Sequence, residues 1–322
     1  MAAPRRGDRG DPYGDATLSA LASVRATPGL ESYLEVLELR LEQAVGTHPG
    51  SAATIGVETL AAGGKRLRPV LVFFATPPEA RHGERPLAAG TAVELVHMAT
   101  LVHDDLLDGA RIRRGRRTAW AQHGEEAARA SGDYLFARAF AQLAAAGDAR
   151  AVSILAEAAL SLARGEALQR HQAFRADTSV EDYLRRCALK TGKLFEAACR
   201  LGGRDELGAF GLALGISFQI ADDILDCTGT TSRTGKAPGV DLRDGTPTLP
   251  LILAAREDER VARALSGESV PDALARVLAT GAIADSRDVA LDYARRARAV
   301  LNGAADRESL EALTHLVVDR SN

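Results

Sequence analysis

The sequence predicts an all-α fold, in which a single domain forms a helical bundle. Alanine and leucine dominate the 322 residues, and aromatic residues make up only 4% of them. Alanine and leucine are both good helix formers. Valine and isoleucine rarely alternate with polar residues, as they would in half-buried strands. A hydrophobic content of 46% is enough for a substantial core.

Helical patterns follow one another along the chain with short breaks. The first is marked by leucines at steps of three and four residues, namely Leu30, Leu34, Leu37 and Leu41. A later helix is expected to begin after Ser179 as its N-cap and to end at the two glycines of 202–203. Two amphipathic helices are expected near the end of the chain, at 271–279 and 306–319.

Three segments depart from these helical patterns. Residues 1–15 are rich in Gly, Pro, Arg and Asp and are expected to be disordered, which leaves 16–322 for the domain. The run VLVFF at 70–74 resembles a strand, but it also fits the start of a buried helix after Pro69. The longest stretch without a helical pattern is 227–247, and a loop of that length is usually functional or mobile.

Charge and cysteine content restrict the class of protein. A formal charge of -3 gives no reason to expect nucleic acid or an anionic membrane as a partner. The scattered cysteines Cys187, Cys199 and Cys227 lack metal-site spacing, which indicates thiols in a reducing compartment. The first residues lack the apolar core of a signal peptide, and no apolar run approaches the roughly 20 residues of a membrane span. We therefore expect a cytoplasmic protein.

The segment HDDLLDGARIRRG, residues 103–115, concentrates negative charge on a short stretch. In a helix Asp104 and Asp108 share a face, and Asp105 lies one step round. Three carboxylates this close raise one another's pKa unless a cation lies between them. Magnesium prefers such oxygens and completes its shell with water and phosphates. On spacing alone, a solvated acidic helix face accounts for the segment equally well.

A second acidic cluster favours the metal hypothesis. FQIADDILD, residues 218–226, repeats the spacing as Asp222, Asp223 and Asp226, and Gln219 lies on the same face. The apolar residues around these carboxylates are typical of a buried helix, whereas solvated faces are rarely so apolar. Two such clusters suggest facing walls of carboxylates with divalent metal ions between them.

Basic residues supply the other half of the predicted site. They are Lys65, Arg66 and Arg68 in GGKRLRP, Arg113 and Arg114 after the first acidic cluster, Lys190 in LKTGKLF, and Lys236 in the long loop. Arginine pairs with phosphate oxygens in a bidentate manner, although single KR and RR pairs are more often surface solubilisers. Metal ions flanked by several cations imply a ligand rich in phosphate. Neither a P-loop nor a GxGxxG after a strand is present, so a nucleotide fold is not indicated.

Five motifs occur in the order of a known family. GGKRLRP, ELVHMATLVHDDLLDGARIRRG, LKTGKLF, FQIADDILD and GKAPGVDLRDGTPTLPLI extend from residue 63 to 252. The chain thereby resembles the polyprenyl synthetases, the trans-isoprenyl diphosphate synthases, and in particular long-chain members that make heptaprenyl or octaprenyl diphosphate. This resemblance implies the type I isoprenoid synthase fold, with helices around a deep central cavity, and a homodimer.

The resemblance also implies the substrates and their ligands. An allylic diphosphate would bind through three Mg²⁺ ions, with Arg113 and Lys236 assisting. The metal-binding residues would be Asp104, Asp105, Asp108, Asp222, Asp223 and Asp226. Isopentenyl diphosphate would bind at Lys65, Arg68, His97 and Arg114. The reacting ends of both substrates would be lined by Lys190, Thr191 and Gln219.

His97, Thr246 and Lys193 are notable for the residue types found at their positions. A histidine in ELVHMATL is more often a core residue than a ligand, but His97 precedes Asp104 by seven residues, two turns along nearly the same face. Thr246 stands where family members commonly have a lysine, so one expected phosphate contact is missing. Lys193 places a charge where a small or apolar residue is usual, and nothing in the sequence accounts for it.

Product length is expected to depend on the helix that carries Asp104. The growing tail would run away from the metals past Thr100 and Ala99, the latter about 7.5 Å from Asp104 along the helix axis. Short-chain members have bulky aromatic residues there, and both residues here are small. We therefore expect an all-trans product of about six to ten isoprene units for a quinone side chain, with geranylgeranyl diphosphate as the alternative. The apolar product implies a transient membrane contact at release.

The sequence leaves two other functions open. A class I terpene cyclase also ionises an allylic diphosphate, but its second motif typically mixes Asn, Ser or Thr, and Glu. The chain could also be the catalytic subunit of a heteromeric synthase. A non-catalytic subunit is disfavoured because both aspartate clusters are intact.

Overall fold

The computed structural model describes residues 22–113, 115–229, 238–304 and 306–318. These residues form helices joined by short connections, apart from one small hairpin of two antiparallel strands. The prediction of an all-α bundle is confirmed. The predicted disorder of residues 1–15 and the predicted roles of Arg114 and Lys236 lie outside the described residues.

The first half of the chain contributes the helices that surround α5. Its elements are α2 (Leu30–Gly46), α3 (Ser51–Ala61), α4 (Leu67–Ala75), the 3-10 helix η1 (Pro78–Ala80), α5 (Glu84–Leu107), the strands β1 (Ile112–Arg113) and β2 (Arg116–Arg117), α6 (Ala119–His123), α7 (Glu125–Ala145) and α8 (Ala149–Gln172).

The second half contributes α11 and the helices that cover it. Its elements are α9 (Val180–Cys187), the π-helix η2 (Ala188–Gly192), α10 (Lys193–Leu201), the 3-10 helix η3 (Asp205–Leu207), α11 (Gly208–Thr228), α13 (Val240–Arg243), α14 (Leu249–Glu257), α15 (Glu259–Leu265), α16 (Ala273–Ala279), α17 (Ala282–Ala299) and α18 (Arg307–Val318).

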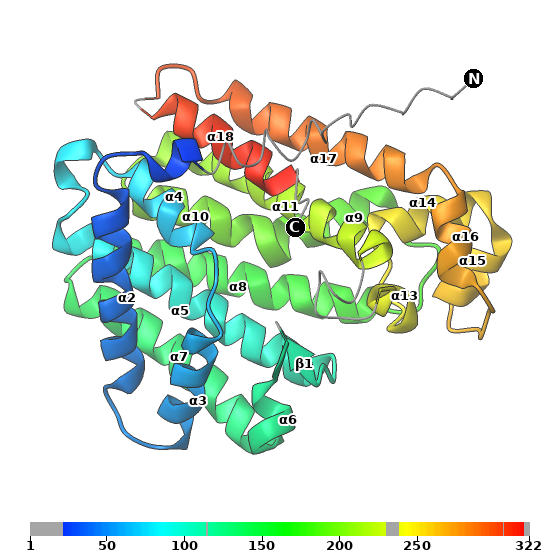
Figure 1. Cartoon of the computed structure of the whole chain (residues 1–322), viewed down its shortest axis with the longest axis horizontal. Coiled ribbons are helices and arrows are strands. Elements are labelled where there is room, and N and C mark those ends of the chain that lie inside the picture. Colours follow the sequence, from blue (N-terminus) through cyan, green and yellow to red (C-terminus); the bar gives the residue numbers. More distant parts are fainter. Residues whose placement is uncertain (1–21, 114, 230–237, 305, 319–322) are drawn as a thin grey trace, which may run out of the picture.

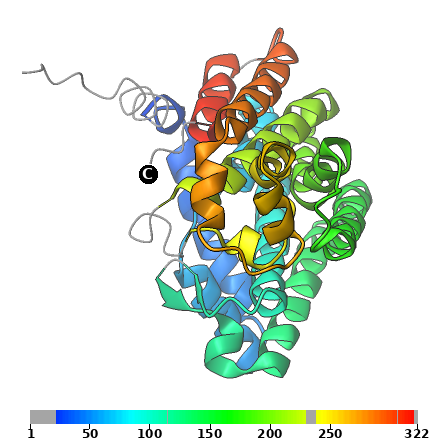
Figure 2. The same ribbon diagram turned by 90° about the vertical axis from the view of Figure 1, so that its right-hand side faces the viewer.

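The longest helices lie side by side in the centre of the bundle. Figure 1 shows α2 running crosswise to α5 and α8 at one end, and α17 along the side next to α11. Figure 2 looks onto the opposite end, which carries α13, α15 and α16. α5 is buried on most of its circumference, as expected for a helix that is apolar nearly all round. Its position makes it the central wall of the site.

α11 is also a central helix, because neighbours pack closely on two of its sides. A Cβ atom added to Gly215 would lie 2.7 Å from the Cα of Gly192, so only glycine allows this approach of α11 to η2. On another side the buried hydroxyl of Ser217 donates a 2.9 Å hydrogen bond to the carbonyl of Ala290 in α17. α11 is therefore fixed between η2 and α17.

Several local predictions are confirmed. The backbone N–H of Asp182 donates to the Ser179 hydroxyl at 3.0 Å, so Ser179 is the N-cap of α9. The ambiguous run 70–74 lies in helix α4, and the two late helices are present as α16 and α18. All three cysteines are buried free thiols.

One helical segment, Asp205–Thr228, is long and apolar enough to cross a membrane by length and composition. It contains α11, and 61% of its most apolar window is buried inside the bundle. Its burial is that of a core helix, and the expectation that no apolar run approaches the length of a membrane span overlooked this segment.

Candidate active site

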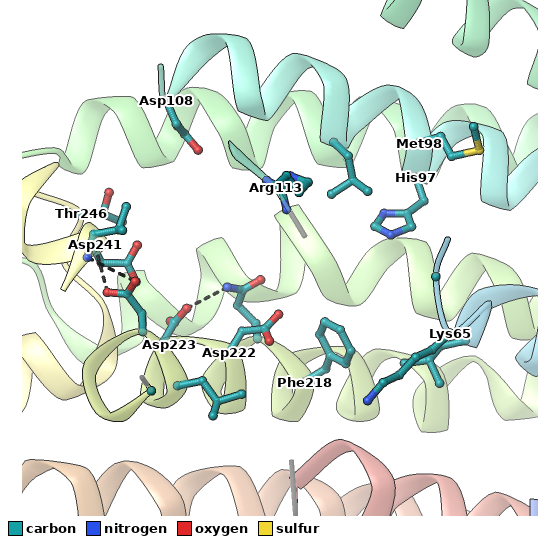
Figure 3. Close-up of a pocket in the computed structure, with 18 of the residues that line it drawn as sticks. Lys65, His97, Met98, Asp108, Arg113, Phe218, Asp222, Asp223, Asp241 and Thr246 are labelled. Atoms are coloured by element: carbon teal, nitrogen blue, oxygen red, sulfur yellow. Dashed lines mark hydrogen bonds between the residues drawn. The ribbon is translucent and has the colours of Figure 1, made fainter. Parts of the chain in front are cut away.

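The two aspartate clusters face each other across a cavity. Figure 3 shows His97 and Asp108 on one wall, opposite Asp222 and Asp223 of α11, with Lys65 at the far end. The cavity has two adjoining lobes of about 830 Å³ and about 440 Å³, which share part of their lining. The fold therefore places both acidic motifs, which the sequence showed at helical spacing, at one site.

Most of the predicted site residues line this cavity. The larger lobe is lined by Lys65, Arg68, His97, Asp108, Arg113, Gln219, Asp222, Asp223 and Asp226. The smaller lobe adds Thr100, Asp104, Lys190 and Thr191. Two predicted residues, Ala99 and Asp105, are not among the described residues that line either lobe.

Asp105 lies behind the cavity wall and holds an arginine. Its carboxylate accepts two hydrogen bonds from Nε of Arg113, at 2.8 and 2.9 Å, and it is only 5% exposed. Arg113 itself lines both lobes. In the structure Asp105 thus positions Arg113, and the role as a metal ligand that the family resemblance implies for it stays a prediction.

Lys190 reaches the first aspartate cluster from the π-helix η2. Its Nζ lies 2.7 Å from Glu166, 3.1 Å from Gln169 and 3.7 Å from Asp104. Burial opposes a charged ammonium, but the carboxylates of Asp104 and Glu166 outweigh it, so the pKa of Lys190 is raised. Lys190 is therefore a fixed positive charge beside Asp104.

The π-helix sets the direction of two predicted catalytic residues. π-turns inside helices are rare and frequently occur at functional sites. Here the turn η2 separates α9 from α10 and contains both Lys190 and Thr191. A Cβ atom on Gly165 of α8 would lie 2.6 Å from the backbone nitrogen of Lys190, so α8 presses closely against this turn. The close packing holds the extra residue of the turn in place.

A chain of hydrogen bonds orients the second cluster. The Thr191 hydroxyl donates to Oε1 of Gln219 at 2.6 Å, and Nε2 of Gln219 donates to Asp223 at 2.8 Å. The hydroxyl of Tyr183 donates to the other Asp223 oxygen at 2.7 Å. Burial nevertheless raises the pKa of Asp223 to about 6, since these donors only partly offset it.

Asp226 holds the short helix that closes one end of the cavity. Its carboxylate accepts hydrogen bonds from the backbone N–H groups of Val240, at 3.3 Å, and Asp241, at 3.0 Å. Asp241 lines both lobes beside the second cluster (Figure 3). Burial, together with the charges of Asp223 and Asp226, raises the pKa of the Asp241 carboxyl.

Sequence reasoning missed three residues at the site, the buried Tyr183 and Arg186 and the half-buried Asp241. Arg186 donates to Gln172 at 2.5 Å and to the carbonyl of Pro247 at 2.8 Å, and so ties α9 to the segment after α13. Asp241 and Tyr183 belong to motifs that were noticed, GKAPGVDLRDGTP and the helix before LKTG. Their roles depend on contacts between distant segments, which no local spacing reveals.

The two departures from the family pattern have different outcomes. Lys193 forms an ion pair with Glu196 at 2.7 Å on its own helix, which accounts for its charge. Thr246 lines both lobes, and its N–H donates to the carbonyl of Asp241 at 2.8 Å. The position where family members commonly have a lysine therefore does face the cavity.

The donor set suits Mg²⁺ that is shared with a ligand. Among the described residues, no group of three or more His, Cys, Asp or Glu side chains is close enough to hold a metal ion by itself. Mg²⁺ usually binds through one or two carboxylates and keeps water and substrate phosphates as its other ligands. Facing carboxylates with raised pKa values, such as Asp104 and Asp223, fit that arrangement.

The raised carboxyl pKa values predict a stability that falls with pH in the absence of metal. Between about pH 4 and pH 6, Asp223 loses its proton in the unfolded chain but keeps it in the folded chain, so rising pH favours unfolding by about 1–3 kcal/mol. In EDTA, the parent should lose more thermal stability from pH 5 to 7.5 than Asp223→Asn does. Identical pH dependence of the two melting temperatures would contradict this assignment.

Tyr183→Phe should weaken metal binding. Loss of the phenolic donor leaves the Asp223 carboxylate less stabilised and less firmly oriented, so Mg²⁺ affinity in the presence of inorganic diphosphate should fall by about tenfold. Calorimetric titration measures it. Tyr293→Phe is the matched control, because Tyr293 packs against the same apolar cluster but is not among the described residues that line either lobe. Equal affinity of Tyr183→Phe and parent would remove Tyr183 from the site.

Comparison with known proteins agrees with this geometry. The family model described as polyprenyl synthetase matches residues 52–277. A nonaprenyl diphosphate synthase of Mycobacterium tuberculosis is 36% identical over 311 residues, 87% of this chain and 91% of the relative. Heptaprenyl diphosphate synthase component 2 of Geobacillus stearothermophilus is 43% identical over 250 residues, 74% of this chain and 77% of the relative.

Solved structures show the same fold. A polyprenyl synthase of Caulobacter crescentus, complexed with calcium and isoprenyl diphosphate, has a TM-score of 0.81 at 34% identity and covers 99% of this chain and 100% of its own. Heptaprenyl diphosphate synthase of Staphylococcus aureus has a TM-score of 0.84 at 27% identity, over 91% and 98% of the two chains. The facing aspartate clusters, the family model and these relatives lead to one conclusion: the chain belongs to the polyprenyl synthetase family.

Proposed function

We propose that this chain is a Mg²⁺-dependent prenyltransferase that adds isopentenyl diphosphate repeatedly to an allylic diphosphate and releases a long all-trans polyprenyl diphosphate in the cytoplasm. The observation that carries the proposal is the pair of aspartate clusters facing across one cavity, with basic side chains beside them. A terpene cyclase needs no second cationic pocket, whereas Lys65, Arg68 and His97 line the larger lobe here.

The proposed division of the cavity follows the positions of its charges. The allylic diphosphate lies between Asp104, Asp108 and the second cluster, where Mg²⁺, when bound, supplies counter-charge to the departing diphosphate. Arg113 and Lys190 add fixed positive charge on the same side. Isopentenyl diphosphate binds at the Lys65 end. The predicted contacts of Arg114 and Lys236 remain part of the proposal.

The chain's own residues favour an ionisation step. The allylic carbon–oxygen bond breaks and its electron pair leaves with the diphosphate, beside the positive charges of Lys190 and Arg113. The isopentenyl double bond then forms the new carbon–carbon bond, and the adjacent carbon loses a proton to the departed diphosphate. Apolar wall residues such as Phe218 exclude water, which would otherwise capture the allylic cation.

The smaller lobe is suited to the growing tail. Part of its wall is formed by the apolar side chains of Phe136, Ala159, Leu162 and Ala163, with Thr100 beside them. Relatives named heptaprenyl, octaprenyl and nonaprenyl diphosphate synthase support a product of about seven to nine units for this chain. We propose that it serves as a quinone side chain, and that the product leaves through transient contact with a membrane.

The assembly is a separate proposal. We infer a homodimer, the state expected from the family resemblance. The Geobacillus relative, however, is named as one component of a synthase, which supports a catalytic subunit with a second chain as the alternative. Activity of the purified chain alone separates the two, because a component that needs a partner would not elongate by itself.

The purified chain should condense isopentenyl diphosphate with an allylic diphosphate only when Mg²⁺ is present. Asp104→Ala and Asp222→Ala should each lower turnover by about 10³-fold or more while the helical fold persists, because both remove carboxylates from the facing walls. Asp177→Ala is the control, since Asp177 is 72% exposed and pairs with Arg175. Parent-like turnover in the two cavity variants would exclude the proposed reaction.

Product length should respond to Thr100 and not to Ala99. A ring at Thr100 would enter the smaller lobe, so Thr100→Phe should shorten the product while condensation continues. Ala99 is fully buried in the main apolar cluster, and Ala99→Phe should mainly destabilise the fold, by about 1–3 kcal/mol. Chromatography of the products and thermal melts measure both effects. Unchanged product length in Thr100→Phe would place the tail elsewhere.

A further inference from the structure

Arg66 has a different environment from the two basic residues that flank its position in GGKRLRP. Nε and Nη2 of Arg66 donate to the two carboxylate oxygens of Glu38 at 2.6 and 3.0 Å. Nη1 donates to Glu94 at 3.0 Å. The Arg66 side chain is only 9% exposed. Its guanidinium is thus engaged by two carboxylates, and a phosphate would have to compete with both.

The backbone of Arg66 adopts a conformation that needs support. Its φ of 48° lies in the left-handed region, which is unfavourable for residues with a Cβ atom. Arg66 is also the N-cap of α4, and its carbonyl accepts the N–H of Val70 at 3.0 Å. Such strained positions persist where surrounding contacts over-determine them. The bidentate pair with Glu38 supplies that support from outside the loop.

The two carboxylates come from a rigid platform of α2 and α5. The hydroxyl of Tyr33 in α2 donates to the carbonyl of Pro86 at 3.2 Å. A Cβ atom on Gly90 would lie 2.2 Å from that hydroxyl, so the two helices are in close contact there. Glu94 lies one turn beyond Gly90 and is 3% exposed. The loop that contains Lys65 is therefore tied to two packed helices through one arginine.

The contacts of Arg66 with Glu38 and Glu94 extend from the larger lobe to a residue outside the cavity lining. Lys65, Arg66, Arg68 and Glu94 line the larger lobe, whereas Glu38 is not among the described residues that line either lobe. The Arg68 guanidinium, on the first turn of α4, lies 4.7 Å from the centre of the Phe195 ring in α10, a cation–π contact that Arg66 does not share. Glu38 therefore does not itself line the cavity, and its hydrogen bonds to Arg66 are what connect it to the loop.

We propose that Glu38, Arg66 and Glu94 form a positioning network that holds Lys65 and Arg68 in the geometry required for isopentenyl diphosphate. Arg66 is a positioning residue in this scheme and not a phosphate ligand. The inference rests on the proposed function, because it uses the assignment of the Lys65 end of the cavity to the isopentenyl substrate. It adds α2 to the elements on which recognition of that substrate depends.

Glu38→Gln is the sharpest test, because Glu38 is 40% exposed and its replacement keeps the shape of the side chain. Loss of the charged partner should loosen the loop and raise the KM for isopentenyl diphosphate by about tenfold. The KM for the allylic diphosphate and kcat at saturation should stay near parent values. Arg66→Lys, which keeps the charge but not the bidentate geometry, should have the same signature.

A double-mutant cycle tests the connection. If Glu38 acts through Arg66, Glu38→Gln combined with Arg66→Lys should raise the isopentenyl KM no more than the larger single change does. Glu84→Gln is the matched control. Glu84 pairs with Arg40 at 2.6 Å and so also joins α5 to α2, but this pair lies away from the lining of both lobes. It should leave both KM values unchanged.

The outcomes separate this inference from the proposed function. An inactive parent, or Lys65→Ala and Arg68→Ala variants with an unaltered isopentenyl KM, would count against the proposed function or its pocket. If those two variants behave as proposed while Glu38→Gln keeps the parent isopentenyl KM, raises both KM values equally, or is additive with Arg66→Lys, the positioning network is overturned. A selective rise in the isopentenyl KM with no loss in the control supports it.

Discussion

Burial of several carboxyl groups in one cavity is the constraint on which the rest of the structure depends. Water screens charges well, but a cavity lined by Phe218, Leu101 and Met98 does not. Burial consequently raises the pKa values of Asp104 and Asp223. The fold tolerates this destabilisation because the faces of α5 and α11 that turn away from the cavity are buried in apolar packing. The same unfavourable state makes the cavity receptive to cations that arrive with a phosphate ligand.

Local patterns were sufficient to predict the helices and the acidic walls. Asp104 and Asp222 could be assigned because carboxylates that recur at helical spacing among apolar residues are rarely part of a solvated face. The actual contact of Asp105 could not be read in this way. Spacing groups it with Asp104, but the chain turns after α5 and brings Arg113 onto it from the hairpin. The sequence distance of eight residues carries no information about that turn.

Residues that act through long-range contacts were beyond local reasoning. Tyr183 meets Asp223 only because α9 and α11 pack together, and the π-turn η2 gives no sign in its composition. Ala99 is a predicted lining residue that the structure places in the core. Its size and spacing suggested a tunnel wall, but a helix buried on nearly all sides has core positions next to lining positions. Thr100 lines the smaller lobe because one residue is a rotation of about 100° on a helix.

The packing of α11 against α17 means that the segment by which the family is recognised is shorter than the segment needed to fold. The family pattern is recognisable over 52–277, yet Ser217, just before the second aspartate cluster, is bonded to Ala290 beyond that segment. Glu38, which contacts the loop of Lys65, precedes it. A gene fragment trimmed to the recognisable segment would expose the apolar flank of its own catalytic helix to solvent. The segment by which the family is recognised thus lies between two less characteristic flanks that complete its packing. If this enzyme were transferred into a longer polypeptide, both flanks would have to be transferred with it.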